Sequence, residues 1–156
     1  MEQLEQVIRQ YADTVYRLAL AHMHNPADAD DVFQDVFLKY AEKSPLFASE
    51  EHRKAWLIRV TVNRCRSHYR SSWWKRLVPL DEAAQAAAPA PADPALDDAL
   101  ARLPAKYRTV IHLHYFENYD TSEIAVLTGR RASTVRAQLT RARQMLGEML
   151  KGEADV

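Results

Sequence analysis

The chain has 156 residues, enough for one ordinary domain or two small ones. Hydrophobic residues make up 47% of it and there are only 3 glycines, so the composition allows a packed core and favours helix. There is no apolar run of the roughly 18 residues that a membrane span needs, and the charged N-terminus is unlike a signal peptide. Cys65 is the single cysteine and cannot form an internal disulfide, so we expect a cytoplasmic location.

The formal net charge is zero, but the charges are segregated along the chain. Residues 1–50 carry 4 basic and 9 acidic side chains, whereas residues 51–80 carry 8 basic and 1 acidic. Residues 81–100 carry 5 acids and no base, and residues 101–156 carry 9 bases and 6 acids. Such segregation predicts different partners at different places, with the basic blocks as candidate contacts for nucleic-acid phosphates.

In chain order, the first half contains three predicted helices. Apolar residues at helical spacing predict the first helix over about 4–24. Asn25-Pro26 then provides a cap and a first-turn proline for a second helix that ends near residue 42. A loop leads to the third helix, over about 52–71.

The second half follows a segment rich in alanine and proline, which we interpret as a semi-extended linker. After it, the pattern predicts a short apolar stripe over 96–103 and helices over about 104–116, 121–128 and 132–150. We therefore expect an all-α fold of two small helical domains, residues 1–74 and 96–156, joined by a linker over 75–95.

The last two predicted helices have the pattern of a DNA-binding helix-turn-helix. Ala125 is small enough for the point where the two helices cross, and Gly129 suits a turn with positive φ. Val135 is the apolar residue through which the second helix packs against the first. We expect Thr121 or Ser122 to cap the first helix. The outer face of the second helix carries three arginines and no acid, with Gln144 beside them, and arginine can pair with guanine edges or phosphates. An ordinary helical hairpin with a solvated charged face is the alternative.

The second predicted helix has an apolar face and an acidic face. Val32, Val36 and Tyr40 belong to the face that we expect in the core. The opposite face places Leu38 within a stripe of acidic and amide side chains, which suggests a docking surface for a basic protein partner. A solvated acidic face, with carboxylates at the helix N-terminus, explains the same pattern about equally well.

The third predicted helix carries a basic stripe, formed by Arg59, Asn63, Arg66 and Arg70 at spacings of 4, 3 and 4. Basic charge beside aromatic residues suits single-stranded or distorted DNA. Trp56 is nearby, and we expect it to pack in the protein and not to stack on a base.

These three features, in this order, resemble the extracytoplasmic-function type of bacterial RNA polymerase sigma factor. The resemblance rests on three runs, DADDVFQDVFLKYAEK, RKAWLIRVTVNRCRSHYR and LPAKYRTVIHLHYFENYDTSEIAVLTGRRASTVRAQLTRARQML. It covers about residues 10–72 and 96–150, and it implies that family region two is joined directly to region four. It implies the partners core RNA polymerase and promoter DNA, a role in promoter-specific transcription initiation, and no cofactor. Family members are usually held inactive by an anti-sigma factor.

The resemblance also implies residue roles. In region two, the acidic helix of the family binds the β′ clamp helices of core polymerase, which corresponds here to Asp31, Gln34, Asp35 and Leu38. The loop and basic helix open the minus-ten element and hold a flipped base, which corresponds to the loop over 46–51 and to Arg59, Asn63, Arg64, Ser67 and Arg70. In region four, the second helix reads the minus-thirty-five element, which corresponds to Arg136, Ala137, Gln138, Thr140, Arg141 and Arg143. Region four of the family also touches the polymerase β flap.

Three departures from the family pattern bear on these roles. Arg130-Arg131 precedes the second helix where the family often has a Ser and a Gly, so the usual cap is lost and we expect these arginines to hold phosphate. Ala137-Gln138 stands where Ser-Arg is common, so one basic contact becomes an amide. The loop over 46–51 is acidic and lacks glycine.

Two other function classes fit the sequence less well. A helix-turn-helix transcriptional regulator without polymerase docking would need a dimerisation face and a sensing pocket, and no ligand motif is present. An enzyme would need a site, yet the Asp-Asp-x-x-Asp pattern of helical prenyl synthases fails at Gln34. The pairs His22-x-His24 and His112-x-His114 point about 200° apart on a helix, so neither chelates a metal. We therefore expect no enzyme activity, no metal site and no small-molecule substrate.

Overall fold

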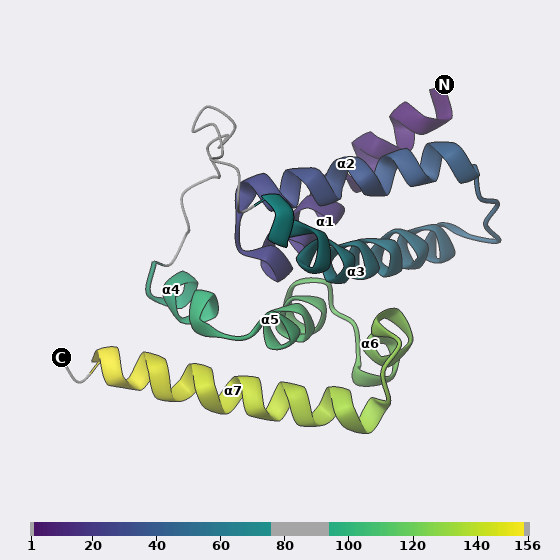
Figure 1. The fold of residues 1–156 in the computed structure, drawn as a ribbon. Coiled ribbons are helices and arrows are strands. Elements are labelled where there is room, and N and C mark those ends of the chain that lie inside the picture. The colour runs from purple at the N-terminus through teal and green to yellow at the C-terminus, as the bar shows by residue number, and fades with distance from the viewer. Residues whose placement is uncertain (1, 76–93, 155–156) are drawn as a thin grey trace. The chain divides into compact units, whose positions relative to one another are not determined.

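The computed structural model describes residues 2–75 and 94–154, and every regular element in these two ranges is helical (Figure 1). The chain divides into two compact units, Met1–Ala87 and Ala88–Val156, here called unit 1 and unit 2. The predicted all-α fold of two small domains is therefore confirmed. Of the predicted linker over 75–95, residues 76–93 lie outside the described ranges. No helix within these ranges is long and apolar enough to cross a membrane.

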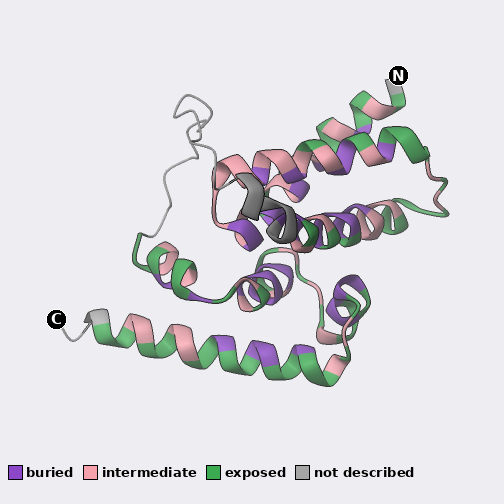
Figure 2. Cartoon of the chain, viewed as in Figure 1, coloured by how far each residue is buried: buried purple, intermediate pink, exposed green. Residues whose placement is uncertain are grey.

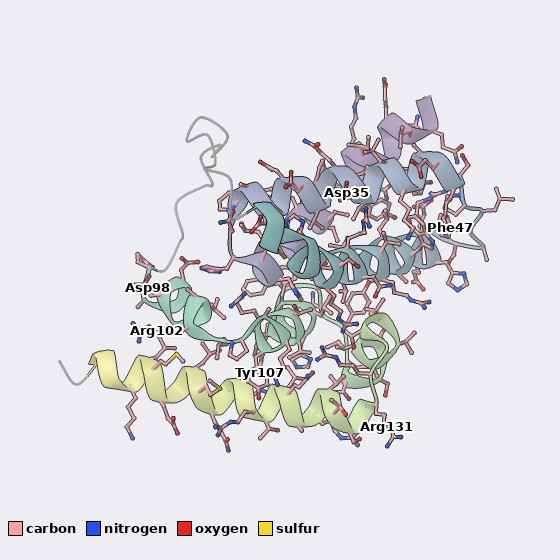
Figure 3. The ribbon with its side chains drawn as sticks, in the orientation of Figure 1. Asp35, Phe47, Asp98, Arg102, Tyr107 and Arg131 are labelled. Carbon is pink, nitrogen blue, oxygen red and sulfur yellow. The ribbon has the colours of Figure 1, made fainter. Side chains whose placement is uncertain are left out.

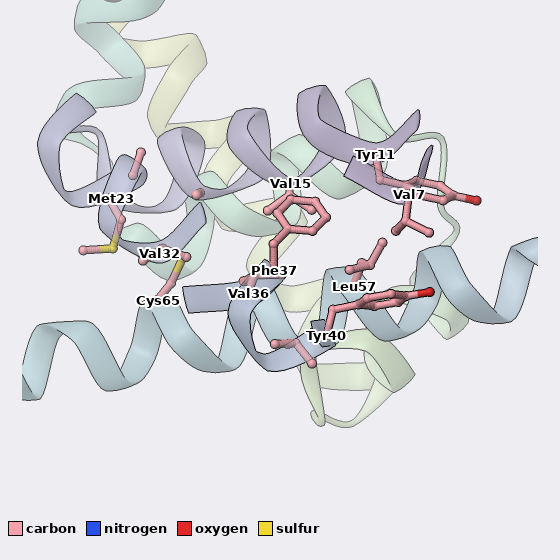
Figure 4. Packing of buried hydrophobic residues seen from close by; sticks show 13 residues of the cluster. Val7, Tyr11, Val15, Met23, Val32, Val36, Phe37, Tyr40, Leu57 and Cys65 are labelled. Carbon is pink, nitrogen blue, oxygen red and sulfur yellow. The ribbon is translucent and has the colours of Figure 1, made fainter. Parts of the chain in front are cut away.

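Unit 1 is built from three helices, α1 (Glu2–Met23), α2 (Pro26–Lys43) and α3 (Glu50–Lys75), each of which contacts the other two. All three contribute to one hydrophobic core, which Figure 4 shows from close by. Its buried members include Val7, Tyr11, Val15, Met23, Val32, Val36, Phe37, Tyr40, Leu57 and Cys65. Burial of this apolar area is the main source of the stability of the unit.

Helix α2 has the core face and the boundaries that its sequence predicts. Val32 and Val36 are fully buried and Tyr40 is nearly so, one helical turn apart from each other. The Asn25 side chain caps the helix by accepting a hydrogen bond from the backbone N–H of Asp28 at 3.1 Å. Ser44 ends it in the left-handed region with φ of 40°.

Helix α3 begins earlier than its sequence predicts. The Ser49 hydroxyl accepts a hydrogen bond from the His52 backbone N–H at 3.2 Å, and the helix starts at Glu50. Glu50 and Glu51, which we predicted in the loop, therefore lie in the first helical turn. The Tyr11 hydroxyl donates to Glu50 Oε2 at 2.7 Å, and this bond together with the Arg53 ion pair holds the pKa of Glu50 below its ordinary value. The Glu50 carboxylate thus ties α3 to α1.

Unit 2 is built around its last helix. It consists of α4 (Pro94–Arg102), α5 (Ala105–Ile111), η2 (His112–Phe116), α6 (Thr121–Thr128) and α7 (Ala132–Ala154). Helix α7 contacts α4, α5 and α6, and Figure 2 shows buried residues recurring along one side of it with exposed ones opposite.

The predicted helix over 104–116 is interrupted in the structure. Its α-helical part is α5, which ends at Ile111, and the chain continues as the π-helical turn η2. There the Glu117 N–H donates to the His112 carbonyl oxygen at 3.2 Å, five residues back. The buried Arg108 guanidinium donates to the Leu103 carbonyl oxygen and thereby joins α5 to the end of α4. Asn118 follows η2 in the left-handed region with φ of 61°.

Helices α6 and α7 form the predicted helix-turn-helix. Gly129 adopts φ of 68°, where a side chain would be strained, and Ala125 and Val135 are buried. The predicted cap at Thr121 or Ser122 is wrong, because Asp120 caps α6. Its carboxylate accepts from the Glu123 N–H at 2.8 Å, and the Glu123 side chain accepts from the Asp120 N–H at 3.1 Å. This reciprocal pair satisfies two backbone donors of the first turn.

We expect Asp120→Ala to lower the free energy of unfolding by about 1 kcal/mol, because the Glu123 N–H in the first turn loses its side-chain acceptor. Thr121→Ala and Ser122→Ala, one and two positions further on, should change it by less than about 0.5 kcal/mol. Urea unfolding followed by far-ultraviolet circular dichroism measures all three. A larger loss for either hydroxyl variant than for Asp120→Ala would contradict this assignment.

Candidate nucleic-acid and partner interfaces

The outward face of α2 carries the residues that we predicted for docking. Gln34 and Leu38 are exposed, and 60% of Leu38 is accessible to solvent. Asp31 and Asp35 are half-buried, and Figure 3 shows Asp35 near the middle of α2. A large apolar side chain is therefore open to solvent on the same helix as the carboxylates.

Asp35 also faces α3. Its carboxylate lies 3.3 Å from the Arg64 guanidinium, and both side chains remain more than 40% exposed. The two residues line a hollow of about 310 Å³ together with Ser67 and His68. Arg64 is thus directed toward α2 and pairs with a predicted docking residue, a contact that helical periodicity along one chain segment does not reveal.

A second polar contact joins the same two helices. The buried His68 places Nε2 at 3.0 Å from Asp28 Oδ1. Asp31 offers a carboxylate oxygen within 4.8 Å of this pair, so the three side chains could together reach a cation. Because the histidine nitrogen already pairs with the Asp28 carboxylate, the cluster is explained as a link between α2 and α3.

The basic stripe lies on the outer side of α3. Within it Arg59 and Asn63 are exposed and Arg66 is half-buried. The neighbouring Ser67 is also exposed, and its hydroxyl donates to the Asn63 carbonyl oxygen at 3.0 Å. Arg70 belongs to the same helix, but its side chain is outside the described part of the structure. Beneath the stripe, Cys65 packs in the core, and burial raises the pKa of its thiol to about 12.

The loop between α2 and α3 is anchored at one residue and open at the next. The Phe47 ring stacks on Tyr40, with centroids 6.3 Å apart, and meets Trp56 edge-on at 6.0 Å. The Arg53 guanidinium carbon lies 5.4 Å from the centroid of the Phe47 ring. Trp56 therefore packs in the protein, as predicted. Leu46, next to the anchor, is 98% exposed.

Helix α7 exposes a basic face. Its buried stripe consists of Val135, Leu139 and Ala142, with Leu146 and Met149 half-buried. The exposed predicted contacts are Arg136, Ala137, Thr140, Arg141 and Arg143. This division is the one that a spacing of 100° per residue predicts.

Gln138 corrects the predicted set of DNA contacts. It is only 9% exposed, and its Oε1 atom is fully buried. Gln138 lies about 60° from Val135 around the helix, next to the buried stripe, so its amide is not presented to a base edge. Helical periodicity alone could have revealed this, whereas the resemblance placed the residue in the reading face.

Helix α7 starts where its sequence predicts. The helix begins at Ala132, and the Arg131 carbonyl oxygen accepts the Val135 N–H at 3.1 Å. Arg131 is exposed at the turn between α6 and α7 (Figure 3), and Arg130 is half-buried. Both arginines therefore precede the first turn of α7, beside backbone N–H groups that favour anions.

Comparison with known proteins matches both units to one family. Residues 7–75 match the family described as "Sigma-70 region 2", and residues 94–146 match "Sigma-70, region 4". SigV of Bacillus subtilis, an RNA polymerase sigma factor, is 29% identical over 150 residues, which cover 94% of this chain and 90% of SigV. The ECF RNA polymerase sigma factor SigL of Mycobacterium tuberculosis is 30% identical over 140 residues, which cover 83% of this chain and 78% of SigL. The chain belongs to the extracytoplasmic-function sigma factors.

A solved structure supports the fold of this sigma factor. RpoE of Bartonella quintana, crystallised with the anti-sigma factor NepR, superposes with a TM-score of 0.76 at 23% identity, covering 97% of this chain and 98% of RpoE. The protein is thus a sigma factor that directs promoter-specific transcription by recognition and is not an enzyme. The alternative of a regulator without polymerase docking is not favoured, because region 2 is present as well as region 4.

Because the pKa of the Cys65 thiol is raised to about 12, we expect the thiol to stay protonated and unreactive in the folded protein. Ellman's reagent at pH 8 should modify less than about a tenth of the protein in the time that modifies all of it in 6 M guanidinium chloride. Rapid labelling of the folded chain, at the rate of the unfolded one, would show that Cys65 is accessible and that the packing of α3 described here is wrong.

Proposed function

We propose that residues 1–74 act as sigma region two, residues 96–156 as region four, and residues 75–95 as the linker between two promoter contacts. In this assignment unit 1 binds core polymerase and the minus-ten element, and unit 2 binds the minus-thirty-five element. The observation that carries the proposal is that three helices each bury one apolar stripe and expose a different surface: acidic on α2, basic on α3 and basic on α7.

The docking surface consists of Asp31, Gln34, Asp35 and Leu38 on α2, and its partner is the β′ clamp helices of core polymerase. The exposure of Leu38 within an acidic helix supports this role, because an exposed leucine gains free energy when a partner covers it. The surrounding carboxylates favour a basic partner and steer its approach. The β flap remains a proposed contact of unit 2.

The minus-ten surface consists of the loop before α3 and of Arg59, Asn63, Arg64, Ser67 and Arg70. Leu46 supports a role for the loop, since its apolar side chain stands in solvent beside the anchored Phe47. The protein supplies no chemistry for melting. It stabilises the open strand by binding it better than the duplex, which shifts the equilibrium toward the open state.

The minus-thirty-five surface consists of Arg130 and Arg131 before α7 and of Arg136, Ala137, Thr140, Arg141 and Arg143 on it. An exposed arginine face on the second helix of a helix-turn-helix suits the major groove. Arg130 and Arg131 are positioned for phosphates near the helix N-terminus.

We also propose a cytoplasmic location and an anti-sigma partner. The location follows from the work of a sigma factor on core polymerase and DNA. The anti-sigma partner is supported by RpoE of Bartonella quintana, which was crystallised with one. A pull-down from the source organism with the full chain as bait tests for such a partner.

We expect Leu38→Ala to weaken binding to core polymerase by about tenfold, roughly 1.4 kcal/mol, because a central apolar contact is truncated. Leu46→Ala removes the same atoms from the other exposed leucine among residues 3–68, whose side chains are described, and is the matched control. It should leave core binding within about twofold and reduce open-complex formation instead, since a single apolar truncation away from the docking surface costs little. Fluorescence anisotropy with labelled sigma factor and permanganate footprinting measure the two effects. Equal losses of core binding would refute the division of roles.

Run-off transcription with core polymerase on a genomic library tests the whole function and yields promoter duplexes for binding. We expect Arg136→Ala/Arg141→Ala to lower affinity for the minus-thirty-five duplex by about 100-fold, since two side chains that read or hold DNA are lost. Lys106→Ala/Lys151→Ala removes the same charge from exposed positions of unit 2 and should have a small effect. If core binding falls as much as duplex binding in the arginine variant, the face assignment is wrong.

A further inference from the structure

Tyr115 is an exposed aromatic residue on η2 that our sequence analysis did not include in any site. It is 51% exposed, and its hydroxyl oxygen accepts a hydrogen bond from Arg143 Nε at 2.6 Å. The Arg143 guanidinium carbon lies 5.6 Å from the centroid of the Tyr115 ring. The two residues are 28 positions apart in the sequence and belong to different elements. Their contact therefore connects the π-helical turn η2 to the exposed face of α7.

We propose that Tyr115 is a positioning residue, which holds the Arg143 guanidinium for a phosphate of the DNA that α7 reads. The inference rests on the proposed function of α7 and deepens it. Arg143 lies seven residues, about 10 Å, beyond Arg136 along the helix. The N-terminal part of a recognition helix meets the base edges, so a residue two turns further on is placed for the DNA backbone.

The hydrogen-bond geometry suits this role. Arginine has five N–H donors, and Tyr115 uses the one on Nε. The two terminal nitrogens stay available as the fork that matches phosphate oxygens. A neutral hydroxyl also orients the guanidinium without cancelling its charge, whereas a carboxylate would neutralise it. In the part of the chain that the structure describes, no carboxylate is ion-paired with Arg143.

The Tyr115 ring is itself held in place. The neighbouring His114 ring meets it edge-on, with centroids 4.8 Å apart and planes at 85°. His114 in turn donates from Nδ1 to the Tyr119 carbonyl oxygen at 2.9 Å, across the turn that follows η2. A fixed ring makes a fixed acceptor, so Arg143 loses less conformational freedom when it binds DNA.

The test measures duplex binding by the full chain at several salt concentrations. The probes are a fluorescein-labelled 30-base-pair duplex from the upstream half of a promoter found by run-off transcription and a random duplex of equal length. The variants are Tyr115→Phe, Arg143→Gln and the double variant. Tyr107→Phe is the matched control, because it removes a tyrosine hydroxyl from α5 of the same unit.

We expect Tyr115→Phe to weaken promoter binding by about threefold, because the Arg143 side chain must then lose conformational freedom when the DNA binds. Arg143→Gln should weaken it more and reduce the slope of log K against log salt by about 0.9, the value for one phosphate contact on B-DNA. In the Arg143→Gln background, Tyr115→Phe should have no further effect. A tyrosine with only a structural role would add its loss in both backgrounds.

Two outcomes would overturn the inference: unchanged duplex binding by Tyr115→Phe, or an equal loss in both backgrounds. Unchanged duplex binding together with weaker core binding would make Tyr115 a residue that docks a protein. The thermal midpoint of each variant identifies a folding defect, and in that case Tyr115→Leu, which also lacks a hydrogen-bond acceptor at this exposed position, replaces Tyr115→Phe. The Arg136→Ala/Arg141→Ala variant tests α7 separately: if it still binds the duplex, the proposed function itself has failed.

Discussion

The packing of Val32 and Val36 between α1 and α3 is the constraint on which the rest of unit 1 depends. Both side chains are fully buried, and a helix of 3.6 residues per turn leaves no freedom once two such positions face inward. Gln34 and Leu38 are then forced outward, and Asp35 is forced to the edge beside α3. The core therefore does more than stabilise the unit, because it determines which side chains a partner can meet.

The same constraint operates in unit 2 through Val135, Leu139 and Ala142, which fix the orientation of α7. Gly129 allows α7 to take this orientation, because its left-handed backbone conformation turns the chain between α6 and α7. Both helices can then reach the core. The exposed arginines of α7 need no packing of their own, so that face is free to vary with the DNA that we propose it reads. Arg143 differs from them because its position depends on η2 as well as on α7.

Much of this arrangement could be predicted from local sequence. Val32 and Val36 follow helical periodicity, Asn25 is a strong cap beside a proline, and Gly129 suits only a few backbone conformations. The Asp120 cap also has a local signal, since Glu123 follows three residues later. Thr121 and Ser122 are equally suitable residue types for a cap, so the sequence alone does not choose among the three. The contacts of Arg64 and Arg143 have no such signal. Each depends on a residue far along the chain, and the π-helical turn that carries Tyr115 shifts the register of its side chains relative to an α-helix.

The Asp35–Arg64 pair shows how the two surfaces of unit 1 depend on each other. Both side chains are more than 40% exposed, so water screens the pair and its contribution to stability is small. With the roles proposed above, each partner has a stronger alternative: a cation of the polymerase for Asp35 and a phosphate of the melted strand for Arg64. Replacing this weak internal ion pair by two intermolecular ion pairs would cost little free energy. The two side chains line the hollow between α2 and α3, where such partners would have to approach. A pair buried in the core could not be exchanged in this way, because separating it would leave an uncompensated charge.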